Sequence, residues 1–193
     1  MKLLKIKLLV VAAFMFAASS AFASYGVDFN VNTSSLNGQS GYLELQLNPG
    51  LSLGSASAQV SNFNSDAVIV GAAALTGNVS GALPGAVDFN NTGAWNDYFQ
   101  QVSFGNSLNF RVDLSGAAGN SFALSFYGAD GVTALLTNDT VNGFASTIDL
   151  NATGASLNNL SSQVAATPTP IPAAAWLLSS GLMGLVGMKR RKQ

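Results

Sequence analysis

Arg111 is the only basic residue in the long central part of this 193-residue chain, where nine carboxylates accompany it. It stands two residues before Asp113 in a stretch of alternating apolar and polar residues, so both side chains are expected on one face of a strand. A guanidinium group can hold a carboxylate or an anionic sugar through two parallel hydrogen bonds. The alternative is an ion pair with Asp113 at the strand surface, which adds little stability.

The carboxylates allow a second kind of chemistry. Two carboxyl groups held roughly 5–10 Å apart across a sugar can hydrolyse a glycosidic bond. No spacing in the sequence singles out such a pair, because Asp is also an ordinary turn residue. Six Asp residues lie near expected strand ends or turns: Asp88, Asp97, Asp113, Asp130, Asp139 and Asp149.

Calcium binding is a third hypothesis for the acidic residues. Asp130, Asn138 and Asp139 stand in oxygen-rich loops, and Ca²⁺ takes about six to eight oxygen ligands. The spacing of the EF-hand calcium loop does not occur in the chain. We therefore predict turns at these residues, with no metal site and no cofactor.

The chain contains no His and no Cys. These absences exclude disulfides, thiol nucleophiles, metal sites built on thiolate or imidazole, and the Ser-His-Asp triad. Residues 24–167 carry one cation and nine carboxylates, a net charge of −8. A surface with this charge repels nucleic acid and anionic lipid, so neither is an expected partner of the central part.

Three aromatic residues, Trp95, Tyr98 and Phe99, stand close together in the sequence. Exposed aromatic rings suit sugar binding, whereas large apolar rings are more often buried. One hypothesis is therefore a ligand-binding face that includes Trp95, Tyr98 and Arg111. The ordinary alternative is that the aromatic rings belong to the core.

Apolar residues alternate with polar ones along most of residues 24–157, as in strands with one buried face. The clearest stretch is 108–114, and turn signals rich in Gly and Asn separate the runs. We predict an all-β domain over residues 24–157, an antiparallel β-sandwich or jelly roll. Residues 158–169 lose the alternation and are predicted to form a stalk. Further strands are predicted at 25–32, 42–47, 56–63, 67–73, 78–83, 86–90, 98–104, 122–126, 132–136 and 144–150.

Residues 1–23 have the three parts of a secretory signal peptide. Three Lys residues precede an uncharged apolar run over residues 8–18, which we expect to be helical. Ala21-Phe22-Ala23 then forms the small-residue pattern that signal peptidase cleaves, so Ser24 is the expected first residue of the mature chain. The apolar run is shorter than the ~20 residues of a membrane-spanning helix.

Residues 170–193 combine a Pro-rich start, an uncharged apolar stretch and a basic end. As a helix, residues 171–188 would reach roughly 27 Å, enough to cross a thin bilayer. Trp176 near the outer end suits the membrane interface, and the terminal cations are expected in the cytoplasm. A transmembrane helix in this orientation places the central part outside the cytoplasm, as the signal peptide also requires.

This tail resembles the sorting signal of the PEP-CTERM proteins, which exopolysaccharide-producing Gram-negative bacteria export and process with an exosortase. Family tails share the order of a Pro-x-Pro motif, a short apolar helix with a central Ser-Gly-Leu, and a basic cluster. A Glu stands between the two prolines of the family motif, and Ile171 takes its place here. The matching positions are Pro170, Ile171, Pro172, Trp176, Ser180, Gly181, Arg190 and Arg191.

The resemblance implies that the exosortase cuts the central part from a temporary membrane helix. The protein would lie in the inner membrane with its central part periplasmic, and then at the cell surface or in the extracellular matrix. A permanent single-span anchor is the alternative. Residues 35–50 also resemble a β-rich domain found with such tails, which has no assigned activity.

These features predict an exported, non-enzymatic protein with a structural or adhesive role in exopolysaccharide or biofilm. Its expected partners are signal peptidase and exosortase during export, and polysaccharide afterwards. The alternatives are a carbohydrate-binding module and, third, a polysaccharide hydrolase that uses paired Asp residues.

Overall fold

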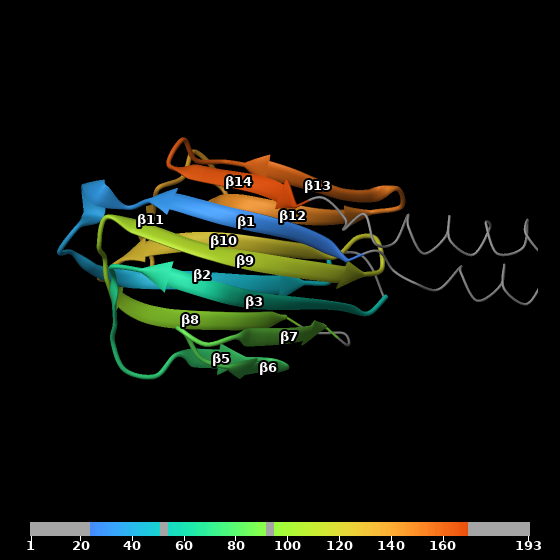
Figure 1. Ribbon diagram of the computed structural model, residues 1–193, viewed down its shortest axis with the longest axis horizontal. Coiled ribbons are helices and arrows are strands. Elements are labelled where there is room, and N and C mark those ends of the chain that lie inside the picture. The colour runs from blue at the N-terminus through green and yellow to red at the C-terminus, as the bar shows by residue number, and fades with distance from the viewer. Residues whose placement is uncertain (1–23, 51–53, 92–94, 170–193) are drawn as a thin grey trace, which may run out of the picture.

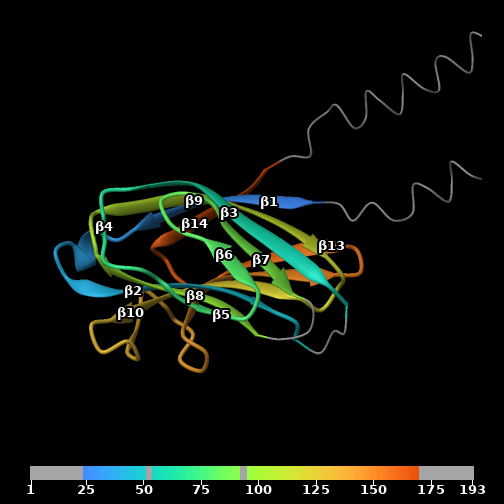
Figure 2. The ribbon, with the colours of Figure 1, turned by 90° about the horizontal axis from the view of Figure 1, so that it is seen from below.

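The computed structural model describes residues 24–50, 54–91 and 95–169. They form two antiparallel β-sheets that pack face to face and contain no α-helix (Figures 1 and 2). The prediction of an all-β sandwich is thereby confirmed. The helices expected for the signal peptide and for the membrane span lie outside the described residues.

The first sheet has six strands, and its outward side is the upper surface in Figure 2. In spatial order its strands are β14 (Val164–Thr169), β1 (Tyr25–Asn32), β9 (Ser107–Gly116), β3 (Ala56–Ser65), β7 (Val87–Asn91) and β6 (Val79–Gly81).

The second sheet contains eight strands. Six follow one another along a main path, and two short strands each pair with one strand of that path. A 3₁₀ turn, η2 (Ser34–Leu36), joins β1 of the first sheet to β2 of the second. The spatial order of the main path is β13 (Gly154–Asn159), β12 (Phe144–Asn151), β10 (Ser121–Gly128), β2 (Ser40–Asn48), β8 (Asn96–Ser103) and β4 (Val68–Ile69), while β11 (Ala134–Leu135) pairs with β10 and β5 (Ala74–Thr76) with β8.

The core lies between the sheets and follows from the period-two pattern of the strands. On β9, the alternate residues Phe110 and Val112 are buried while Asn109 and Arg111 face outward. Phe110 pairs in register with Phe29 of β1, and their rings stack with centroids 4.9 Å apart. The prediction of an alternating strand over residues 108–114 is confirmed.

The stalk predicted for residues 158–169 is wrong over β14. Residues 164–169 pair with β1 as an edge strand, in a register that joins Val31 to Val164 and Gly26 to Thr169. Val164 is buried, whereas the small and polar residues that follow give only a weak alternation. An edge strand held mainly by backbone hydrogen bonds to one neighbour does not need a strong apolar pattern. The folded domain therefore reaches Thr169.

Strand β2 is buried on both of its sides. Leu43, Leu45 and Leu47 face the core, while Glu44 and Gln46 point away from it and are also largely buried. Figure 2 shows loops near β10 projecting from the outer side of the eight-stranded sheet.

Candidate functional site

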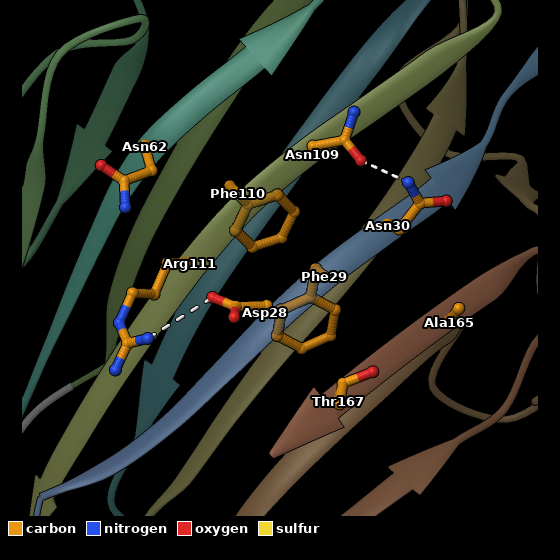
Figure 3. A pocket seen from close by; sticks show the side chains of 9 residues that line it. All are labelled: Asp28, Phe29, Asn30, Asn62, Asn109, Phe110, Arg111, Ala165 and Thr167. Carbon is orange, nitrogen blue, oxygen red and sulfur yellow. Dashed lines mark hydrogen bonds and ion pairs between the residues drawn. The ribbon is translucent and has the colours of Figure 1, made fainter. Parts of the chain in front are cut away.

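Arg111 is held between two carboxylates on the outer side of the six-stranded sheet (Figure 3). Its Nε and Nη2 donate to Asp113 Oδ2 and Oδ1, both at 2.8 Å, and its Nη1 lies 3.5 Å from Asp28 Oδ1. The hydrogen bonds from Arg111 to Asp113 raise the pKa of Arg111. Both edges of the guanidinium fork are therefore engaged within the protein, as the ion-pair alternative predicts.

A shallow depression of about 310 Å³ lies beside Arg111. Figure 3 shows its side chains on β1, β9, β3 and β14, where the amide of Asn30 donates to that of Asn109. Asn62 lies at a bulge of β3, with a φ of 54°. Thr167 contributes from the edge strand β14. Beside the ion pairs, the depression therefore combines amide and hydroxyl groups with apolar surface that includes Phe29, Phe110 and Ala165.

A second depression, of about 530 Å³, lies on the same side over β3, β7 and β9. Gln59 Nε2 donates to Asp88 Oδ1 at 2.7 Å, and the hydroxyls of Ser57 and Ser115 are 3.1 Å apart. We call the outward side of β14, β1, β9, β3 and β7 the polar face. Its two depressions are lined by side chains that can donate to and accept from the hydroxyls of a sugar.

The structure separates the three residues of the predicted ligand face. Trp95 is 52% exposed, so the alternative that it fills the core is wrong for this residue. Tyr98 is fully buried between the sheets, where its hydroxyl accepts from the Leu83 amide at 3.0 Å and donates to Gln100 Oε1 at 3.1 Å. Arg111 belongs to the other sheet. These residues do not form one site.

Three of the Asp residues cap turns. Asp66 accepts from the backbone of Asn106 and Ser107 at 2.8–2.9 Å, and these bonds lower its pKa to about 2. Asp130 and Asp139 each accept from amides two and three residues further on, which lowers the pKa of both. The turn interpretation of Asp130 and Asp139 is therefore confirmed.

The sequence analysis missed a pair of carboxyl groups on the outer side of the eight-stranded sheet. Glu44 of β2 is 9% exposed, and Asp97 of β8, the cross-strand neighbour of Gln46, lies on the same side of the sheet. Burial, then the charge of Glu44, raises the pKa of Asp97 to about 7. We call Glu44 and Asp97 the carboxyl pair.

Aromatic side chains enclose the carboxyl pair. Tyr127 Oη donates to Glu44 Oε2 at 3.0 Å, and burial together with the charge of Glu44 raises the pKa of Tyr127 to about 12. The rings of Tyr42 and Phe99 stack with centroids 4.5 Å apart, and Phe99 lies 5.9 Å from Tyr127. Gly131, in the loop after β10, lies against Tyr42 and Phe99. Glu44 is thus largely buried, whereas Asp97 is half-buried.

One feature of the sequence indicates the position of this carboxyl pair. Glu44 is the only Glu of the chain, and it stands in the middle of a strand instead of a turn. Its neighbours across the strands are Phe99 and Ser125, so no Lys or Arg faces it. A lone mid-strand Glu without a cationic partner indicates a carboxyl group held for a purpose other than solubility.

Comparisons of the chain with known protein families, with curated proteins and with solved structures give no match. The fold and the site geometry therefore define the class of protein, an all-β antiparallel sandwich, and the function has to be argued from its residues. Within the described ranges, no helix is long and apolar enough to cross a membrane. The predicted sorting residues from Pro170 to Arg191 and the cleavage residues Ala21 and Ala23 lie outside those ranges.

Proposed function

We propose that this chain is an exported protein of the cell surface or extracellular matrix, with a structural or adhesive role toward polysaccharide. The observation that carries the proposal is the polar face, which extends over five strands and is built largely from Asn, Gln, Ser and Thr. Groups of this kind exchange hydrogen bonds with neutral sugars, whereas the negative charge of the domain disfavours nucleic acid.

Export and sorting belong to the same proposal. The tripartite segment 1–23 supports recognition by signal peptidase, and the tail 170–193 supports recognition by an exosortase. Both segments lie at the ends of a domain whose first strand begins at Tyr25 and whose last ends at Thr169. The described strands therefore form a complete two-sheet domain without either segment.

The adhesive role is tested by sedimentation of the exported protein with the extracellular polysaccharide of its own cells. We expect Asn109→Ala, on the polar face, to leave more protein in the supernatant than the wild type does. Asn37→Ala is the matched control, because it also breaks one exposed bond between two Asn side chains, at a position outside that face. Equal sedimentation of both variants and the wild type would reject the role of the polar face.

A carbohydrate-binding module centred on Trp95 is the second candidate. The exposure of the Trp95 indole ring favours sugar binding at this residue, because an exposed aromatic face can stack on a sugar ring. Loss of glycan-array binding in Trp95→Ala, with binding kept in Asn109→Ala, would favour this module over the polar face.

The hydrolase alternative has less support. Of the Asp residues, Asp66, Asp130 and Asp139 already accept backbone amides, and Asp28 and Asp113 bind Arg111, whereas glycosidases use two carboxyl groups roughly 5–9.5 Å apart around the substrate.

A further inference from the structure

The two sheets end in four edge strands, β14 and β6 on the first sheet and β13 and β4 on the second. An edge strand presents unpaired N–H and C=O groups, which proteins usually block with Pro, charged residues, bulges or short strand length. Strand β6 has three residues and β4 has two, so neither offers a long ladder. Strands β14 and β13 have six residues each and are long enough to pair with a further strand.

The free edge of β14 is blocked. The Asn32 amide donates to the Gln163 carbonyl at 2.9 Å, and hydrogen-bonded pairs alternate along an antiparallel ladder. The residues whose backbone groups point away from β1 are therefore Val164, Ala166 and Pro168. Pro168 has no N–H group, and the Val164 amide already donates to a carbonyl three residues earlier. Ala166 alone thus offers an N–H group to a further strand.

Strand β13 carries no such protection. The Leu160 amide donates to the Ala145 carbonyl at 3.0 Å, and the same alternation then joins Ser156 and its second neighbours to β12. The residues whose backbone groups point away from β12 are Ala155, Leu157 and Asn159. The strand contains no Pro and no charged residue. It pairs with β12 alone among the described strands and lies at the upper margin of the molecule in Figure 1.

We propose that β13 pairs antiparallel with β13 of a second copy of this chain, so that two eight-stranded sheets become continuous. The two-fold axis of this dimer passes beside Leu157, which faces Leu157 of the second copy. Ala155 then faces Asn159 of the second copy, and the reverse pair is equivalent. In this register all the outward residues form hydrogen-bonded pairs, each exchanging both of its N–H···O bonds.

The side chains of β13 are complementary to themselves in this register. Leu157 is half-buried against the margin of the core, and a second Leu157 beside it would remove further apolar surface from water. On the opposite side of the strand, the Ser156 hydroxyl faces the Asn158 amide of the second copy. The strand is neutral within a strongly acidic domain, so no like charges meet directly. This self-complementarity favours a second copy over an unrelated extended peptide.

The contact is small, which sets the kind of association to expect. Pairing of two short edge strands buries less than the roughly 1,200–2,000 Å² of a stable interface, so the dimer should be weak and should form only at high concentration. Strand β13 belongs to the sheet that does not carry the polar face. Failure of the dimer would therefore leave the adhesive role untouched, and the reverse also holds.

The test is sedimentation equilibrium of the exported protein over a range of concentrations. We expect the wild-type mass to rise with concentration toward twice that of the monomer. Leu157→Lys and Leu157→Glu should each stay monomeric, because like charges then meet at the axis, whereas an equimolar mixture of the two should regain the dimer. Ala165→Lys is the matched control, because it adds the same charge at an exposed position of β14, and it should associate as the wild type does. Wild-type protein that is monomeric at every concentration would overturn the proposal, and so would undiminished association of Leu157→Lys.

A second measurement needs no variant and covers the case in which these substitutions prevent folding. Amide hydrogen exchange of the wild type is followed residue by residue at low and at high concentration. We expect several-fold slower exchange at Ala155, Leu157 and Asn159 in the concentrated sample, and a smaller change at Ser156 and Asn158, whose amides already bond to β12. Equal rates at the three outward residues in both samples, in protein whose mass has doubled, would place the contact elsewhere and overturn the proposal.

Discussion

The carboxylates of this protein have different hydrogen-bond partners and different pKa shifts, depending on their surroundings. Asp66, Asp130 and Asp139 accept backbone amide hydrogens in turns, and their pKa values are lowered. Asp97 is shielded beside Glu44, and its pKa is raised. Composition alone gives nine equivalent acidic groups, whereas the fold makes three of them turn caps, two partners of Arg111 and two a carboxyl pair, and joins Asp88 and Asp149 to neutral side chains.

Asp66 is predicted to stabilise the contact between the loop after β3 and the start of β9. Its carboxylate accepts from the backbone of Asn106 and Ser107 and from the side chain of Asn106. Asp66→Ala should lower the melting temperature at pH 7 more than the exposed control Asp88→Ala does. Because the folded pKa is lowered to about 2, the difference between wild type and Asp66→Ala should shrink as the pH falls from about 4 toward 2.

Asp97 is predicted to give the opposite pH dependence. Its folded pKa of about 7 lies above the usual value, so the folded state holds a proton that the unfolded state has released. Stability should therefore fall as the pH rises from about 4 to 7, by on the order of 1–2 kcal/mol after allowance for solvent screening. Denaturant unfolding of the wild type and Asp97→Asn measures this slope, and an equal slope in both would contradict the assignment.

At the scale of the elements, the local pattern predicted most strands because each one buries alternate residues against a single core. The edge strand β14 was missed since its pairing with β1 rests on backbone hydrogen bonds and on one apolar residue, Val164. The carboxyl pair was missed for another reason. Glu44 and Asp97 are far apart in the chain, and only the non-local register of β2 with β8 brings them together.

Because residues 164–169 form a strand of the sheet, a buried residue of this strand should contribute to stability, which would not be expected in a stalk. Val164→Asp places an unpaired charge at a position that is 5% exposed, and should destabilise the fold by several kcal/mol. Ala165→Asp is the matched control, because the next residue of the same strand is exposed and should change stability by no more than about 0.5 kcal/mol. Two variants of equal stability in denaturant unfolding would contradict the docking of β14.

At the scale of the whole molecule, the polar face and the carboxyl pair lie on opposite outer sides of the sandwich. The domain between them has a net charge of −8 from one cation and nine carboxylates, which the seven basic residues of the two tails mask in the whole chain. The central claim is that both tails are removed during export.

Intact-mass measurement of the exported protein tests that claim most directly. In a strain with an active exosortase, we predict a mature chain that begins at Ser24 and lacks the residues after Pro172, apart from any mass added by attachment at the surface. The folded domain from Tyr25 to Thr169 should be intact within this product. Exported protein that still carries the segment from Trp176 to Gln193 would contradict the account.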